Sequence, residues 1–278
     1  YSFCRVADDL VDNANTEEEA HQWISKLTQF LDLSYGKNQQ DSTFMHVKES
    51  YIVNNFPGFT HSALRLLPTE IISSKPLYDL FEGFKTDLKF LRMRHSASIN
   101  GNSSPIVDEH DLEIYASRVA GTVAELCLEL VFYHSKINTT LAQRKLLLGA
   151  GKVMGIALQY VNISRDIETD SKISRVYFPS IWLKEEGITH NQILEQPFGP
   201  AVEKLMSRLL DLAFCHYNKS RHEILQIPSE ARSPMRVAVE SYMEIGRVLK
   251  EKKYRGRGKA TVPWWRRFKV AWKALQET

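Results

Sequence analysis

The spacing of apolar residues constrains this chain more than any other feature of its sequence. Apolar side chains recur at intervals of three and four residues in the five long segments 77–91, 112–133, 146–167, 201–225 and 235–249. This period is that of an α-helix with one buried face. The sustained alternation typical of a half-buried strand is absent from the sequence. The pattern therefore predicts an all-α protein.

The same pattern predicts a single domain. Breaks rich in glycine and proline separate segments of helix length, and neither an internal repeat nor a long linker divides the chain. Residues 1–278 are therefore expected to form one helical domain, long enough to bury a sizeable core. Tyr1 already lies in an amphipathic helical pattern without a start signal, so we expect an N-terminal helix to be missing.

Composition excludes several classes of protein. The 36 basic and 33 acidic residues are interleaved, and a net charge of +3 is too small to indicate nucleic-acid binding. Cys4, Cys127 and Cys215 have the spacing of neither a disulfide framework nor a zinc site, which favours a reducing compartment. The most apolar stretch, 146–163, contains polar residues such as Lys152, so it is interpreted as a buried helix rather than a membrane span.

A first acidic cluster lies near the N-terminus. Helical geometry places Arg5, Asp8 and Asp12 on one stripe, opposite an apolar face. Like charges at this spacing cost a helix about 0.2–0.5 kcal/mol unless a cation lies between them. A small set of oxygen ligands suits Mg²⁺, which retains water and accepts phosphate oxygens. A solvated acidic face is the alternative interpretation.

A second acidic cluster lies on a helix that is apolar on nearly every side, within 151–170. Its polar strip consists of Gly155, Gln159, Asn162, Asp166 and Asp170. Such a helix is buried, and buried carboxylates must be paired, hydrogen-bonded or metal-bound. We therefore expect the strip to line an internal cavity, where Asn162, Asp166 and Asp170 offer oxygen ligands. A strip satisfied by a neighbouring helix is the alternative.

Together the two clusters predict a diphosphate site. Carboxylate pairs on separate helices can face each other across a bundle and hold several Mg²⁺ ions between them. Mg²⁺ and the guanidinium groups of Arg5, Arg165 and Arg175 would stabilise a departing diphosphate, so that an allylic carbon–oxygen bond ionises. An ordinary surface ion pair is the alternative for each arginine. The carbocation must be shielded from water, and the small apolar residues at 119–123 suit a cavity wall. Ordinary helix packing is the alternative for these residues.

These motifs resemble the squalene/phytoene synthase family of head-to-head prenyl synthases. Residues 1–12 (YSFCRVADDLVD) resemble its first aspartate-rich motif, 159–170 (QYVNISRDIETD) its second, and 175–179 (RVYFP) the flap that follows. Residues 115–123 (YASRVAGTV) resemble the stretch between the motifs. The resemblance covers nearly the whole chain. It implies an all-α isoprenoid-synthase bundle with a central cavity, in which two prenyl diphosphates condense to a cyclopropyl diphosphate that rearranges to a symmetrical hydrocarbon.

The resemblance also assigns roles to individual residues. The Mg²⁺ ligands, which would also accept Mn²⁺, would be Asp8, Asp12, Asn162, Asp166 and Asp170. The substrate-binding residues would be Arg5, Gln159, Arg165, Arg175, Tyr177 and Lys259. Tyr115 and Tyr242 would lie with the four aspartates at the reacting centre. Two departures from the family pattern are Thr169, which stands where a Glu is usual with Glu168 displaced beside it, and the absence of the family's first helix.

Within the family the sequence is closer to phytoene synthases, and resembles the synthase half of fungal bifunctional enzymes in which a membrane-embedded lycopene cyclase comes first. That implies condensation of two geranylgeranyl diphosphates through prephytoene diphosphate to phytoene, without a nicotinamide cofactor. The alternatives are squalene or dehydrosqualene synthesis from farnesyl diphosphate, and a non-catalytic relative that acts in assembly.

The C-terminal segment 262–278 combines three tryptophans with basic residues. This composition predicts an interfacial amphipathic helix and peripheral contact with a membrane. A terminal helix docked on the domain with its basic face in water is the alternative.

Overall fold

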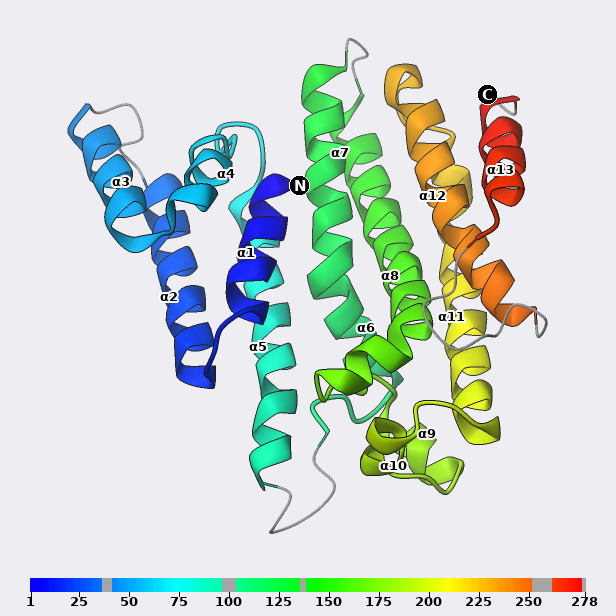
Figure 1. The fold of residues 1–278 in the computed structure, drawn as a ribbon. Coiled ribbons are helices and arrows are strands. Elements are labelled where there is room, and N and C mark those ends of the chain that lie inside the picture. The colour runs from blue at the N-terminus through cyan, green and yellow to red at the C-terminus, as the bar shows by residue number, and fades with distance from the viewer. Residues whose placement is uncertain (37–41, 97–103, 136–138, 252–261, 277–278) are drawn as a thin grey trace.

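The computed structural model describes residues 1–36, 42–96, 104–135, 139–251 and 262–276, and in these ranges the chain is helical without strands (Figure 1). The all-α prediction is confirmed. The elements are α1 (Ser2–Asp12), α2 (Glu17–Ser34), α3 (Ser42–Asn55), η1 (Gly58–Thr60), α4 (His61–Arg65), α5 (Ser74–Ser96), α6 (Glu109–Ala116), η2 (Ser117–Gly121), α7 (Thr122–His134), α8 (Leu141–Lys172), α9 (Ser180–Glu185), α10 (His190–Glu195), α11 (Pro200–Ile224), α12 (Ser229–Lys250) and α13 (Trp264–Gln276).

The five segments of strong helical periodicity all form helices. Four correspond to α5, α8, α11 and α12, and the fifth is the run α6–η2–α7, in which η2 is a short π-helical segment. The periodic segment predicts this helix only from residue 235, but α12 begins at Ser229 and continues through Pro234. The face that carries Val239 and Met243 is buried, and this packing offsets the single backbone hydrogen bond that proline removes.

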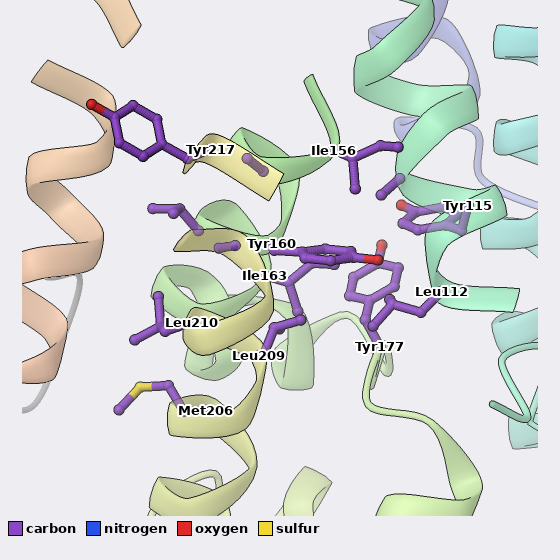
Figure 2. Packing of buried hydrophobic residues seen from close by; sticks show 14 of the residues in the cluster. Leu112, Tyr115, Ile156, Tyr160, Ile163, Tyr177, Met206, Leu209, Leu210 and Tyr217 are labelled. Atoms are coloured by element: carbon purple, nitrogen blue, oxygen red, sulfur yellow. The ribbon is translucent and has the colours of Figure 1, made fainter. Parts of the chain in front are cut away.

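Two groups of helices make up the bundle. In one, α1, α2 and α5 bury a core that contains Phe3, Phe30 and Phe81. In the other, α8 runs through the middle between α7, α11 and α12 (Figure 1). Its core brings Tyr160 of α8 against the α11 side chains around Leu209 (Figure 2). The helix α8 is long and apolar enough to cross a membrane by length and composition, and its packing against these neighbours is that of a core helix.

Glycines let η2 approach both groups closely. A Cβ atom on Gly155 of α8 would lie 2.6 Å from the carbonyl oxygen of Ala120. One on Gly83 of α5 would lie 2.5 Å from Cγ1 of Val119. Only a residue without a side chain fits at such distances. Residues 119–121 thus pack helix against helix, and this contact sets α5 and α8, which both carry site residues, around η2.

Candidate active site

A buried carboxylate with two tyrosines lies between the two groups of helices. Asp87 of α5 is 6% exposed and accepts hydrogen bonds from the hydroxyls of Tyr115 at 2.9 Å and Tyr177 at 2.8 Å. The two rings are stacked, with centroids 5.0 Å apart (Figure 2). Burial raises the pKa of Asp87 to about 6, and the nearby cation of Arg175 opposes the rise. This carboxylate therefore organises both hydroxyls.

Arg175 connects this centre to the N-terminal cluster. Its Nη2 lies 2.7 Å from Oδ1 of Asp12. Arg175 as a whole is only 9% exposed. The turn after α8 puts it there: Ser174 has a φ of 64°, and the Arg175 amide donates to the Asp170 carbonyl at 2.9 Å. The Nε–H of Arg175 is buried and has no hydrogen-bond partner in the part of the chain that is described. A buried donor in this state is suited to an anionic ligand.

The first cluster is positioned by the apolar face of α1. Phe3 contacts Phe30 of α2 and Phe81 of α5, with ring centroids 5.9 Å and 6.5 Å away. Burial raises the pKa of Asp8 to about 6, and the charges of Asp12 and Asp87 add to the rise. Arg5 points outward, where it pairs with Asp9 at 2.9 Å and approaches Asp8 at 3.7 Å.

The second cluster lies in the last turns of α8. Burial raises the pKa of Asp170 to about 7, and the charge of Asp166 adds to this effect while Arg175 opposes it. Asp87 also acts on Asp170, as it does on Asp8. Both acidic clusters therefore lie within electrostatic reach of Asp87, and they do not occupy opposite outer surfaces.

A polar chain links α8 to α12 beside the second cluster. The Tyr242 hydroxyl donates to Oδ1 of Asn162, whose Nδ2 donates to Oε1 of Gln159 at 3.2 Å. Arg165 donates from Nη1 to the Tyr242 oxygen at 3.2 Å and from Nε to Asp166 at 2.9 Å. All five residues come from the predicted set, and only Tyr242 lies outside the second motif.

The residues of the second motif that depart from the family pattern lie on the outer side of α8. Thr169 is exposed, and Glu168 accepts a hydrogen bond from Lys172 at 3.1 Å. The predicted phosphate ligand Lys259 lies outside the described residues.

Sequence reasoning missed Asp87, although a signal was present. Along α5 the apolar positions Phe84 and Leu88 define the buried face, and Asp87 lies on that face between them. An acidic residue on an apolar stripe must find partners in the fold. The partners, Tyr115 and Tyr177, are distant in sequence, so nothing local identified them.

The donor set fits Mg²⁺. The side chains are oxygen donors, and the carboxyl pKa values of Asp8 and Asp170 are raised partly by like charges that a cation would offset. Among the described residues, no three acidic, histidine or cysteine side chains form one preassembled metal site. Mg²⁺ needs no such site, because it is commonly held by one or two carboxylates with substrate phosphate oxygens and water.

Comparison with known proteins identifies the family of the chain. A model of the family described as squalene/phytoene synthase matches residues 1–266. The chain belongs to this family. At 50% identity over 100% of its length, it is similar to a protein of Phaeosphaeria nodorum named bifunctional lycopene cyclase/phytoene synthase. Proteins of the same name from Gibberella fujikuroi and Neurospora crassa are 48% and 49% identical over 100% of this chain. The chain spans 45%, 46% and 47% of these three relatives, respectively.

Solved structures of two synthases share the fold of this chain. A dehydrosqualene synthase bound to a ligand superposes with a TM-score of 0.69 at 22% identity, covering 100% of this chain and 84% of that one. A squalene synthase from Alicyclobacillus acidocaldarius gives 0.63 at 17% identity, covering 91% of this chain and 81% of that one. The predicted single-domain synthase bundle is thereby confirmed.

Proposed function

We propose that this squalene/phytoene synthase domain condenses two geranylgeranyl diphosphates head to head, through prephytoene diphosphate, to phytoene. Two diphosphates and two protons leave in the course of the reaction. The observation that carries the proposal is the Arg175–Asp12 contact, which brings two acidic pairs from distant parts of the chain around one buried cationic side chain. The three relatives that are 48%, 49% and 50% identical to this chain over its whole length carry phytoene synthase in their names.

In this proposal Asp8, Asp12, Asn162, Asp166 and Asp170 hold Mg²⁺, or Mn²⁺ in its place. When bound, the metal neutralises charge on the leaving diphosphate. Arg175 contributes its buried Nε–H to a diphosphate oxygen, and Arg165 turns from Asp166 toward the same ligand. Only the movement of Arg165 exchanges an ion pair within the protein for one with the substrate, because the Nε–H of Arg175 has no partner among the described residues to give up. Arg5 is more exposed than Arg165 and Arg175, and it binds diphosphate at the outer edge of the site.

The tyrosine pair provides a polar group beside the reacting carbons. The hydroxyls of Tyr115 and Tyr177 donate to Asp87, so their oxygen lone pairs remain available. A proton lost from carbon passes to a tyrosine oxygen while the phenolic proton moves to Asp87, whose raised pKa favours acceptance. Gln159 and Tyr242 position the second cluster from the other side.

The proposal is tested by product analysis. The full-length protein is incubated with geranylgeranyl diphosphate and Mg²⁺, and released diphosphate and extracted hydrocarbon are measured by mass. Phytoene is expected in Mg²⁺ and in Mn²⁺, and none with chelator. A folded protein that yields no hydrocarbon under these conditions contradicts the assignment.

A second candidate is a synthase that uses farnesyl diphosphate, because a dehydrosqualene synthase and a squalene synthase are among the similar solved structures. The same assay with farnesyl diphosphate distinguishes this candidate from a phytoene synthase. Omitting NADPH then separates squalene formation, which requires it, from dehydrosqualene formation, which like phytoene formation does not. A non-catalytic assembly role is the third alternative. Calorimetry would then detect no Mg²⁺-dependent binding of diphosphate.

We also place this activity at a membrane. The relatives combine the synthase with a lycopene cyclase in one chain, and the hydrocarbon product is insoluble in water. Cys4, Cys127 and Cys215 are free thiols, consistent with a reducing compartment.

A further inference from the structure

The C-terminal helix α13 presents a row of large apolar side chains to solvent. Positions 264, 268, 272 and 275 follow helical spacing, and 265 lies beside 272 on the same face. Phe268 and Trp272 stack with ring centroids 6.0 Å apart. The exposed fractions are 79% for Trp264, 50% for Trp265, 63% for Phe268, 55% for Trp272 and 49% for Leu275. We call these five residues the aromatic face.

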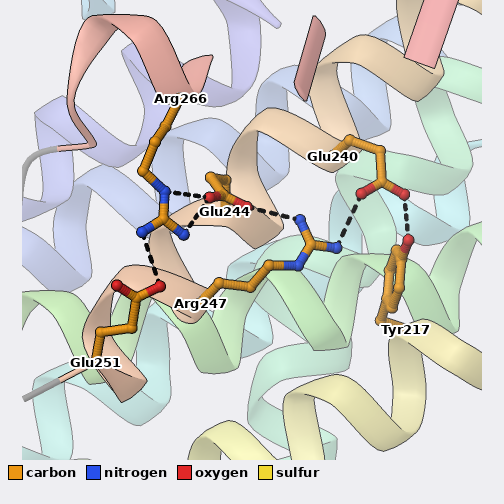
Figure 3. A network of polar contacts seen from close by, with 6 residues as sticks. All are labelled: Tyr217, Glu240, Glu244, Arg247, Glu251 and Arg266. Carbon is orange, nitrogen blue, oxygen red and sulfur yellow. Dashed lines mark hydrogen bonds and ion pairs between the residues drawn. The ribbon is translucent and has the colours of Figure 1, made fainter. Parts of the chain in front are cut away.

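The opposite face of α13 is fixed to α12. Ala274 is 2% exposed, and Arg266 donates from Nε to Glu244 at 2.6 Å and from Nη1 to Glu251 at 2.7 Å (Figure 3). Glu244 is itself buried and also pairs with Arg247 at 3.0 Å. Because this network holds Arg266 against α12, the aromatic face is directed away from the domain.

Cationic side chains flank the aromatic face. Lys269 and Lys273 lie along one edge and Arg267 lies along the other, and all three are exposed. From Val262 to Gln276 the sequence contains four basic residues and no acidic one. Aromatic rings between lysine and arginine side chains match the boundary of a bilayer, where rings enter the headgroup region and cations remain with the phosphates.

A cavity of about 550 Å³ beside Lys269 and Lys273 is lined by residues of α11, α12 and α13. Its three glutamates, Glu240, Glu244 and Glu251, are paired with Arg247 and Arg266. Arg221, Lys269 and Lys273 also line it, so its lining carries more positive than negative charge. This surplus favours an anionic headgroup over a neutral one.

We infer that α13 binds the surface of a phospholipid bilayer that contains anionic lipid, with its aromatic face inserted among the headgroups. The helix lies in the interface and does not span it, because α13 is shorter than a membrane-spanning helix. The binding itself is independent of catalysis. Only its purpose, delivery of a water-insoluble hydrocarbon to the bilayer, rests on the proposed function.

The test is co-sedimentation of the full-chain protein with vesicles of phosphatidylcholine alone or mixed with phosphatidylserine. We expect the triple variant Trp264→Ala, Phe268→Ala, Trp272→Ala to weaken partitioning by about tenfold or more. The matched control is Phe59→Ala with Leu66→Ala. These residues are 73% and 79% exposed but belong to the α4 region, on the far side of the molecule from α13 (Figure 1). The control should partition like wild type.

A second pair of variants separates charge from ring insertion. Lys269→Gln with Lys273→Gln should remove the preference for phosphatidylserine and its sensitivity to salt, while binding to phosphatidylcholine changes little. Tryptophan fluorescence of the wild type should shift to shorter wavelength with vesicles and be quenched by brominated acyl chains.

Two results would overturn the inference. One is equal partitioning of wild type and triple variant at unchanged helicity and melting temperature. The other is a change of oligomeric state in the triple variant with vesicle binding intact, which would make the aromatic face a contact with another protein copy. Phytoene formation measured in detergent is a separate readout, so failure of the proposed function is recognised independently.

Discussion

Arg175 donates from Nη2 to Oδ1 of Asp12 at 2.7 Å, across 163 positions of sequence. This contact joins the turn after α8 to the end of α1. It brings together the acidic pairs of the two helices, which also act on the shared carboxylate Asp87. A diphosphate bound there would meet negative side chains suited to cations and a buried guanidinium suited to its oxygens.

The metal role of the acidic pairs predicts a loss of turnover without a loss of fold. Asp8→Asn and Asp166→Asn should each reduce diphosphate release by about a hundredfold or more, because each removes charge that holds a cation at the leaving group. Asp211→Asn is the control, since Asp211 pairs with Lys250 on an exposed surface. Wild-type turnover in both site variants would exclude the metal role.

Asp87 should matter for stability as well as for activity. Asp87→Ala removes the acceptor of two buried hydroxyls and a carboxylate near Arg175, so we expect a loss of about 3 kcal/mol in the free energy of unfolding. Asp87→Asn keeps an acceptor and should lose less. Urea unfolding measures both. Asp79→Ala, which breaks only the exposed pair with Lys75 on the same helix, should change stability by less than about 1 kcal/mol.

Asp170 should make the metal-free protein less stable as pH rises. Its pKa is raised from 3.8 to about 7 in the folded chain, so between these values the folded state binds more protons than the unfolded state. The contribution of Asp170 to the free energy of unfolding is fully present below about pH 4 and is lost as the pH rises through about 7. Asp170→Asn should therefore stabilise the protein at about pH 8 in chelator by about 2 kcal/mol, and much less at about pH 4. Melting curves at both pH values measure the difference, and a gain that does not depend on pH would show that ionisation of Asp170 is not its cause.

Two glycines of α8 should respond in opposite ways to the same substitution. Gly155→Ala places a Cβ 2.6 Å from a backbone oxygen of Ala120, and should destabilise the protein by about 1–3 kcal/mol. Gly149 is exposed with no heavy atom within 4 Å of an added Cβ. Gly149→Ala should therefore stabilise the helix by up to about 1 kcal/mol. Thermal melting of the two variants compares them, and a loss in both would indicate that the close approach is not the reason.

Local sequence patterns are sufficient to predict the helices and the two acidic pairs. Helical period is a local property, so α5, α8, α11 and α12 and the stripe that carries Asp8 and Asp12 follow from neighbouring residues. The resemblance to a known family added Tyr115, Tyr177 and Tyr242, whose positions no local pattern indicated.

Which side chains contact one another depends on how the helices pack. The apolar stripe of α5 marks Asp87 as a residue that needs partners, but only the fold shows that these partners are Tyr115 and Tyr177. The orientation of α13 depended in the same way on Arg266 reaching Glu244. The physical reason is that burial, pairing and pKa shifts arise from contacts between residues distant in sequence, and these exist only once the helices have packed.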